Sequence, residues 1–528
     1  MREDIPDPSL RSRTEAGSSP DAILGVAALV VLGALWIVGT ADLQFASSDI
    51  LVPVFTSLYR WTPYFWGETR FGMVIPLLAA PIHSPVANLV FQKALGHALG
   101  LLFPFLLARW LGLGQRWLVA GALGATTLIL ALGPYFLHFF FVAQCYIVSA
   151  TPAVAGALLL DARRRTLRLA GWLTLAIAFW ITPSTLLWLA PMMVLRPLAR
   201  HPERPQSLRA AVPALTARLG LVAGLAFTIA WSGRLVHGVR ATPLGLAPAA
   251  EWPATWIVLA RGAYAHLPVG WLLLFVVVGL GLALVHRLRQ APAHLASARF
   301  VVVALSAGAV AQLLGAGVFA WVTQGRAEPA GWRFAIPSVV FMLLAPPFAV
   351  AALGFSAAGG WRKAVVPSRL RTWLPLLLPV GALALVVGLP SLARSRAALE
   401  FNARSGLHLG PLADELVERG ATHLLAPYPL AYPLAFRANS RRFGAGERRP
   451  VWPLAARVEA ARDLWEPADW TTARIAVMRE LPAQRGQARL APFDLDSARK
   501  ALRLPALVLV ERGERFDIYR GGSGHPVP

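Results

Sequence analysis

Hydrophobic residues fill most of this chain in stretches of roughly 20 positions, and short basic segments separate them. A helix of about 20 apolar residues is long enough to cross the hydrocarbon core of a bilayer. The stretches lie near 22–40, 87–108, 117–133, 145–160, 169–181, 184–195, 211–230, 268–285, 300–320, 335–354 and 373–390. The pattern predicts a polytopic α-helical membrane protein with about 11 transmembrane helices.

Basic residues between the stretches predict the orientation of the chain. About 20 arginines and lysines lie in alternate segments, which are 1–21, 109–116, 161–168, 196–210, 286–299 and 355–372. Such segments stay on the cytoplasmic side of a membrane. We therefore expect a cytoplasmic N-terminus and, after an odd number of spans, an extracytoplasmic C-terminus. Asp161 and Glu203 fall among the cytoplasmic arginines and are expected to pair with them.

The run 169–195 lies between two basic segments, so both of its ends should be on the same side. Each half of the run, divided at 181–184, is only about 20 Å long at 1.5 Å per residue. That is too short to cross alone, and we expect two short helices that meet at a turn inside the membrane. The alternative is one long tilted helix, which would invert the topology of everything downstream.

Composition narrows the function classes. The chain is 56% hydrophobic and 15% charged, with a mean hydropathy of +0.55. Its net charge of +23 comes almost entirely from arginines scattered between the apolar stretches. Because they form no continuous stripe in the sequence, we expect no nucleic-acid partner. The single cysteine, Cys145, excludes an intramolecular disulfide framework.

The C-terminal part has a different pattern, typical of a small α/β domain. Helix-like stretches lie at 411–419, closed by Gly420, at 453–464 and at 494–502. Strand-like runs lie at 422–427, 474–478 and 506–520, the last with a turn at Arg512-Gly513. The expected organisation is a cytoplasmic segment 1–21, a transmembrane domain 22–390 with a first external loop 41–86, and an extracytoplasmic α/β domain 391–528.

The first external loop is rich in aromatic residues and carries Asp49 and Glu68 among few other charges. A carboxylate at a membrane interface can act as a general base on a hydroxyl, or hold a divalent cation such as Mg²⁺ or Mn²⁺ that bridges a phosphate. A solvated loop charge remains the simpler interpretation of each, and nearby Arg70 can neutralise Glu68.

A second candidate feature lies between the ninth and tenth spans, where Arg326 and Arg333 reach the extracytoplasmic side. The planar guanidinium of arginine matches a pair of phosphate oxygens. The alternative is an arginine that extends to the phosphates of ordinary lipids. The second external loop contains His138 and no carboxylate.

Taken together, the chain resembles the GT-C superfamily of integral membrane glycosyltransferases, in particular bacterial proteins of the family 39-like or dolichyl-phosphate-mannose mannosyltransferase-like type. The resemblance rests on an Asp soon after the first span, interfacial aromatics, short paired helices, the segment Arg333-Phe334-Ala335-Ile336-Pro337 and an external C-terminal domain. It extends to ATHLLAPYPLAYPLAFRANSRRF, interpreted as a strand, a Tyr-rich turn and a basic stretch leading into a helix. The chain departs from family 39 at Asp49, which is followed by Ile50 and not by Glu.

The resemblance implies an inverting transfer of a hexose or pentose from a polyprenyl-phosphate donor to a lipid or glycan acceptor, outside the cytoplasmic (inner) membrane. It implies Asp49 as the base with Glu68 as a second carboxylate, and Arg333 and Arg326 as ligands of the donor phosphate. The expected acceptor or loop contacts are Arg70, Tyr64, Trp66 and His138. The missing carboxylate in the second loop favours a metal-independent reaction. A requirement for a divalent cation stays open.

Two other functions remain compatible with the sequence. A transporter or flippase for a lipid-linked or polar solute would also have many spans, although most spans here lack ionisable residues, with Lys93 and His97 as the main exceptions. A non-catalytic envelope assembly protein would account equally well for a large external domain.

Overall fold

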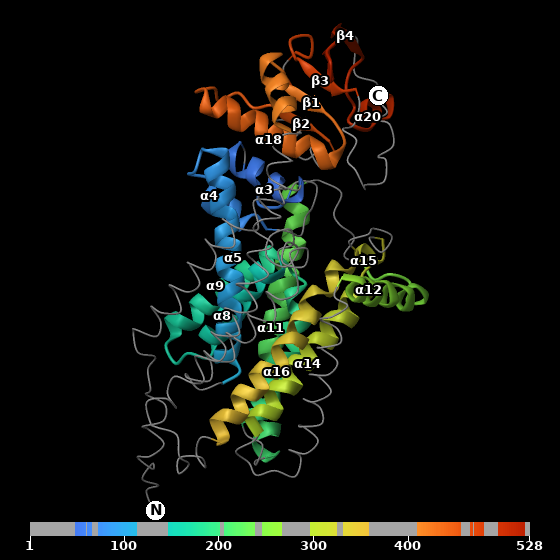
Figure 1. The fold of residues 1–528 in the computed structure, drawn as a ribbon. Coiled ribbons are helices and arrows are strands. Elements are labelled where there is room, and N and C mark those ends of the chain that lie inside the picture. Colours follow the sequence, from blue (N-terminus) through green and yellow to red (C-terminus); the bar gives the residue numbers. More distant parts are fainter. Residues whose placement is uncertain are drawn as a thin grey trace, which may run out of the picture.

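The computed structural model describes residues 48–59, 61–65, 72–112, 146–200, 205–237, 245–266, 296–324, 331–357, 409–455, 465–467, 469–479 and 495–522. These residues form thirteen labelled α-helices, a further helix at 409–418 and five strands. Figure 1 shows an elongated helical bundle with a small α/β domain at one end. The predicted fold class is therefore confirmed in its coarse form, as a mostly helical chain with a C-terminal sheet domain.

The bundle consists of α5 (Pro85–Trp110), α8 (Tyr146–Leu160), α9 (Arg165–Ile181), α10 (Thr185–Arg200), α11 (Pro205–His237), α14 (Ala296–Gly317) and α16 (Ile336–Ala357). Shorter elements are α3 (Ser48–Leu58), α4 (Val74–Ala79), η3 (Ala249–Glu251), α12 (Trp252–His266), α15 (Ala320–Gln324) and η6 (Gly331–Ala335). Among the described residues, three helices are long and apolar enough to cross a membrane, namely Pro85–Trp110, Pro213–Gly233 and Phe300–Gly317. The spans expected near 22–40, 117–133, 268–285 and 373–390 lie outside the described residues.

Large apolar side chains point away from the bundle in rows. On α9 the row consists of Leu169, Leu173 and Ile177, which are spaced by one helical turn and are 40–61% exposed. Similar exposed residues are Phe227 and Trp231 on α11 and Val303, Val310 and Leu314 on α14. An apolar surface of this extent is typical of contact with a membrane or another protein.

The helix pair predicted within 169–195 is confirmed. Helix α9 ends at Ile181 and α10 begins at Thr185, with Thr182 in an extended conformation between them. The carboxylate of Asp161, just before α9, forms an ion pair with Arg196 near the end of α10. The start of α9 and the end of α10 therefore lie at the same end of the bundle, and the alternative of one long helix is wrong.

Asp161 also accepts hydrogen bonds from Arg218 of α11 at 3.1 Å, so the predicted pairing of Asp161 with arginines is confirmed. Arg196 lies over the ring of Trp110, the last residue of α5, at 5.1 Å. These residues mark one end of the bundle, which we call the far end. The α/β domain covers the opposite end, which we call the domain end (Figure 1).

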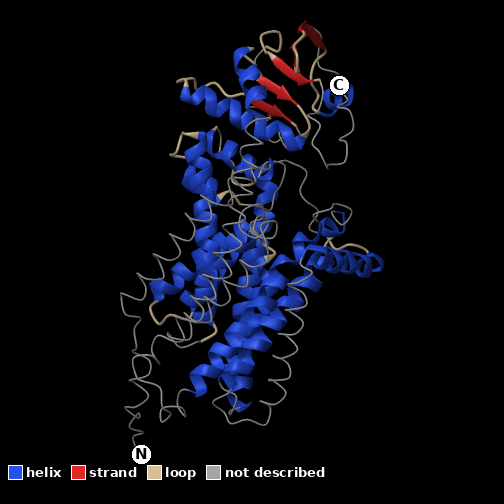
Figure 2. Cartoon of the chain, in the orientation of Figure 1, coloured by secondary structure: helices blue, strands red, loops and turns tan. Residues whose placement is uncertain are grey.

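The α/β domain has a five-stranded mixed sheet (Figure 2) in the order β2-β1-β3-β5-β4. Its strands are β1 (His423–Leu425), β2 (Trp452–Leu454), β3 (Ile475–Met478), β4 (Leu507–Glu511) and β5 (Phe516–Gly521). β1 pairs in parallel with β2 and β3, whereas β5 pairs antiparallel with β3 and β4. The three strand-like runs and the turn within 506–520 are thus confirmed.

The helices of this domain are 409–418, α18 (Tyr428–Gly444) and α20 (Leu495–Ala501). The first is closed by Gly420 at φ 62°, as expected for a residue that must be left-handed at a helix end. The expected Tyr-rich turn is wrong, because those residues form the start of α18. Its Pro429 lies in the first turn, where no backbone N–H is needed. The helix expected from 453 is also wrong at its start, which belongs to β2, while 456–464 lie outside the described residues.

Candidate functional site

Asp49 lies in the first turn of α3, at the junction between the bundle and the α/β domain. A carboxylate in the first turn of a helix is favoured by the helix dipole. Its Oδ1 accepts a hydrogen bond of 2.7 Å from the hydroxyl of Tyr428, the first residue of α18. The neighbouring Ser48 hydroxyl donates to the backbone carbonyl of the same tyrosine. Two consecutive residues of segment 41–86, the predicted first external loop, therefore bind one residue of the C-terminal domain.

Helix α3 is buried beneath α18. Eight of its residues are inaccessible, although the segment was expected to be a polar loop at a membrane surface. Phe55 packs edge-on against Tyr432 with ring centroids 5.7 Å apart, and Tyr59 lies 5.2 Å from Trp452. Burial raises the pKa of Tyr59, which keeps its hydroxyl neutral. The side of α3 next to the sheet domain is thus apolar and aromatic.

On its other side, α3 is held to α5 by buried amides. Asn88 donates to the Ser57 hydroxyl at 2.8 Å and to the Ala79 carbonyl at 3.0 Å. Gln92, one turn further along α5, donates to the Asn88 side chain at 2.7 Å. Buried amides of this kind are stabilising only when their hydrogen bonds are made. The network therefore fixes α3 and α4 on the domain end of α5.

The middle of the first external loop is bound to the end of α9. The Gly72 N–H donates to the Trp180 carbonyl at 3.0 Å, and the Trp180 indole donates to the Pro63 carbonyl at 3.0 Å. Tyr64 is buried, and its hydroxyl donates to the Ile229 carbonyl of α11 at 3.2 Å. In this structure Tyr64 anchors the loop to the bundle, and its role as an acceptor contact stays a prediction.

Arg333 lies on η6, the short helix before α16, with its guanidinium 5.2 Å from the centre of the Phe334 ring. Phe334 belongs to a small apolar cluster with Leu259 of α12 and Ala316 of α14. That cluster is separate from the one that contains α3 and the sheet domain. Asp49 and Arg333 therefore lie beside different apolar clusters of the structure.

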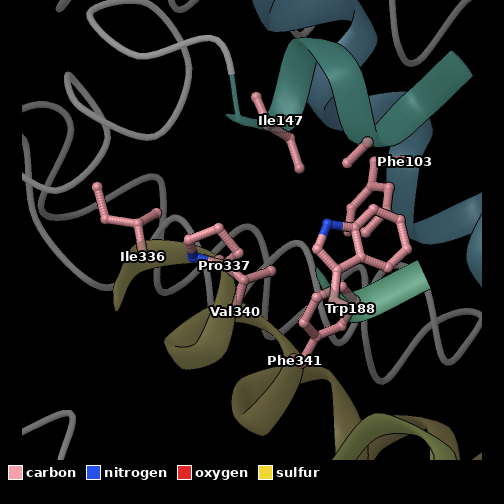
Figure 3. Close-up of a pocket in the computed structure, with 8 residues that line it drawn as sticks. Phe103, Ile147, Trp188, Ile336, Pro337, Val340 and Phe341 are labelled. Atoms are coloured by element: carbon pink, nitrogen blue, oxygen red, sulfur yellow. The ribbon is translucent and has the colours of Figure 1, made fainter. Parts of the chain in front are cut away.

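An apolar cavity begins one turn after Arg333. Its accessible volume is about 10 Å³, and it is bounded by α5, α8, α10 and α16 (Figure 3). Its lining residues are Phe103, Ile147, Ala150, Trp188, Ile336, Pro337, Val340 and Phe341. At that volume the cavity has room for about one water-sized molecule.

The remaining predicted site residues, Glu68, Arg70, Trp66, Arg326 and His138, lie outside the described residues. Within the part of the chain that the structure describes, no group of three or more His, Cys, Asp or Glu residues is arranged to hold a metal ion. The metal dependence of the predicted reaction stays open.

Tyr428 is the residue at this site that the sequence did not reveal. It lies 379 positions from Asp49, and its neighbours Pro427 and Pro429 suggested a turn. No local pattern predicts a contact over that separation. The only signal was that the first loop and the C-terminal domain were both expected outside the membrane.

No protein-family model matches the chain, and no curated protein matches it.

Proposed function

We propose that this protein is an integral membrane glycosyltransferase that moves a sugar from a polyprenyl-phosphate donor to an acceptor hydroxyl on the extracytoplasmic side. The observation that carries the proposal is the position of Asp49. A carboxylate lies in a short helix at one end of a bundle with candidate membrane spans, directly beneath a sheet domain. An acceptor that approaches from outside the membrane would meet this end of the bundle.

In the proposed reaction, the acceptor oxygen attacks the anomeric carbon while the bond from that carbon to the phosphate oxygen breaks. The acceptor proton passes to the Asp49 carboxylate, and the polyprenyl phosphate leaves with the bonding electron pair. Attack opposite the leaving group inverts the anomeric configuration. Asp49 must therefore lie within hydrogen-bond reach of the acceptor hydroxyl when both substrates are bound.

Arg333 supports the donor side of the proposal. An arginine binds a phosphate through two parallel N–H bonds and stabilises its growing charge as it departs. The cavity that follows it along α16 has an apolar lining, but at about 10 Å³ it would admit an isoprene unit only after the side chains around it move. The proposal requires Arg333 and Asp49 to approach the same sugar, which makes their joint mutation its strictest test.

The experiment measures transfer of radiolabelled sugar from a panel of polyprenyl-phosphate sugars in membranes with matched protein levels. We expect Asp49→Asn to lower the rate by about 10²- to 10⁴-fold, the usual loss of a general base. We expect Arg333→Ala to lower it by roughly 10²-fold and Arg333→Lys by less, because lysine keeps the charge but loses the paired bonds. Asp414→Asn, which changes an exposed carboxylate of the C-terminal domain, is the control.

No transfer by the wild type across the panel would contradict the proposal. Transfer that survives Asp49→Asn would remove Asp49 as the base, and transfer that survives Arg333→Ala would remove Arg333 from the donor site.

Transport of a lipid-linked or polar solute is the second candidate, and one observation favours it. Lys93 and His97 are fully buried in α5, one turn apart. Ionisable side chains inside a candidate span commonly mark a path for a solute or proton. Uptake or flipping of a labelled polyprenyl-phosphate sugar in proteoliposomes, abolished by Lys93→Met and unaffected by Asp49→Asn, would favour transport over transfer.

A further inference from the structure

The contact between Asp49 and Tyr428 joins two segments that are distant in the sequence. The hydroxyl of Tyr428 donates to Oδ1 of Asp49 at 2.7 Å. A hydrogen bond to an ionised carboxylate is roughly twice as strong as one between neutral groups, and this one restrains the position of Oδ1. The C-terminal domain therefore contacts Asp49 through the hydroxyl of Tyr428.

The structure holds Tyr428 itself rigidly. Its backbone carbonyl accepts a hydrogen bond from Ser48, and its ring packs edge-on against Tyr432 at 5.5 Å. Pro427 and Pro429 flank it in the sequence, and each proline ring restricts the backbone beside it. A donor fixed at its backbone, its ring and its hydroxyl is suited to orient the group that it binds.

Apolar residues of α3 also pack against the C-terminal domain. Phe55, one and a half turns beyond Asp49, packs against Tyr432 of α18, and both rings belong to the core of the C-terminal domain. Movement of α18 away from the bundle would separate Tyr428 from Asp49 and would expose the apolar side of α3. The orientation of the carboxylate is thus coupled to the docking of the domain.

We infer that Tyr428 is a positioning residue for Asp49, and that the C-terminal domain completes the site by orienting this carboxylate towards the acceptor hydroxyl. The inference rests on the proposed function, in which Asp49 is the base. Tyr428 acts through Asp49 and takes no proton from the substrate.

The test uses the full-length protein in proteoliposomes with Tyr428→Phe, which removes only the hydroxyl. Tyr432→Phe is the matched control, because it removes a hydroxyl from the same helix one turn further on and keeps the aromatic ring. We expect Tyr428→Phe to lower kcat by roughly 10- to 100-fold, the range for loss of a hydrogen bond to a charged group, with little change in the KM for the donor. Adding Tyr428→Phe to Asp49→Asn should lower kcat no further, because the base is already absent.

A second readout does not depend on activity. Hydrogen exchange of the α3 amides, residues 48–58, should be roughly tenfold faster in Tyr428→Phe than in wild type or Tyr432→Phe, because one link between α3 and α18 is lost.

Wild-type kcat in Tyr428→Phe would overturn the inference, and so would an equal loss of kcat in Tyr432→Phe, which would indicate packing alone. If the wild type transfers no sugar, the proposed function fails. The exchange measurement then decides whether Tyr428 holds Asp49 in place. Equal exchange of α3 in wild type and Tyr428→Phe would then show that Tyr428 does not hold Asp49.

Discussion

At the scale of single residues, Gly72 determines how closely the first external loop approaches the bundle. A Cβ atom at this position would lie 2.6 Å from the Trp180 carbonyl oxygen and 2.8 Å from the Trp180 ring. Real Cβ atoms do not approach a backbone oxygen so closely. The position therefore requires glycine for the loop to form its hydrogen bond with the end of α9.

We predict that Gly72→Ala destabilises the protein by about 1–3 kcal/mol, the usual cost of forcing an atom into a closely packed contact. Thermal unfolding of the purified protein in detergent measures the change. Gly220→Ala is the control, since its added Cβ meets open space and alanine is favourable in a helix. A Gly72→Ala variant as stable as Gly220→Ala would mean that the loop does not pack on α9 as described.

At the scale of elements, the α9–α10 pair determines which helix ends lie together. The hydrophobic pattern predicted the break, because Pro183 follows Thr182 and each half is short. The ion pair of Asp161 with Arg196 shows in addition that the chain returns through α10 to the far end of the bundle. Helix α9 lies against α8 at Gly156 and Gly171, where either added Cβ would come within 2.9 Å of the opposite backbone. Small residues let two helices approach in this way.

The helix pair makes a topological prediction that single-cysteine labelling can check. After Cys145→Ser the chain has no other cysteine. In oriented membrane vesicles, we expect a membrane-impermeant maleimide to label Arg163→Cys and Ser207→Cys from the same side. The reason is that α9 runs away from the far end of the bundle and α10 runs back to it. His83→Cys, at the domain end before α5, should be labelled from the opposite side. Labelling of Ser207→Cys from the same side as His83→Cys would contradict the return of the chain to the far end through α10.

At the scale of the whole molecule, the core of the sheet domain includes part of the bundle's first loop. Ile50, Leu51, Val54 and Phe55 of α3 pack into one apolar cluster with residues of α18 and the strands. The α/β domain therefore buries its apolar surface against a segment from near the other end of the chain. Folding of the domain and formation of the Asp49 site are coupled by this shared core.

We predict that Phe55→Ala destabilises the C-terminal domain by about 3–5 kcal/mol, as expected for a buried phenylalanine. Limited trypsin digestion provides the measurement, because Arg442 is 5% exposed in the folded domain and becomes accessible when α18 loosens. Leu77→Ala on α4, where the side chain is 44% exposed, is the control. Cleavage after Arg442 at the same rate in both variants would show that α3 does not support the domain.

The sequence by itself determined the features that depend on nearby residues. Apolar stretches, their length and the Thr182-Pro183 break predicted the helical class and the paired helices, because helix formation follows the local pattern. Apolar runs and Gly420 similarly predicted four of the strands and the end of one helix. The same local reasoning failed at Tyr428 and Pro429, where prolines in the first turn of a helix resemble a turn.

Only the tertiary structure decided what surrounds the candidate carboxylate. The sequence selected Asp49 from its place in the first external loop, but its partner comes from a helix 379 positions away. The choice of that partner depends on how α18 packs over α3, and packing of distant segments leaves no periodic signal in either one. For the same reason Arg333, chosen with Asp49 from the sequence, was found beside Phe334 in a separate apolar cluster.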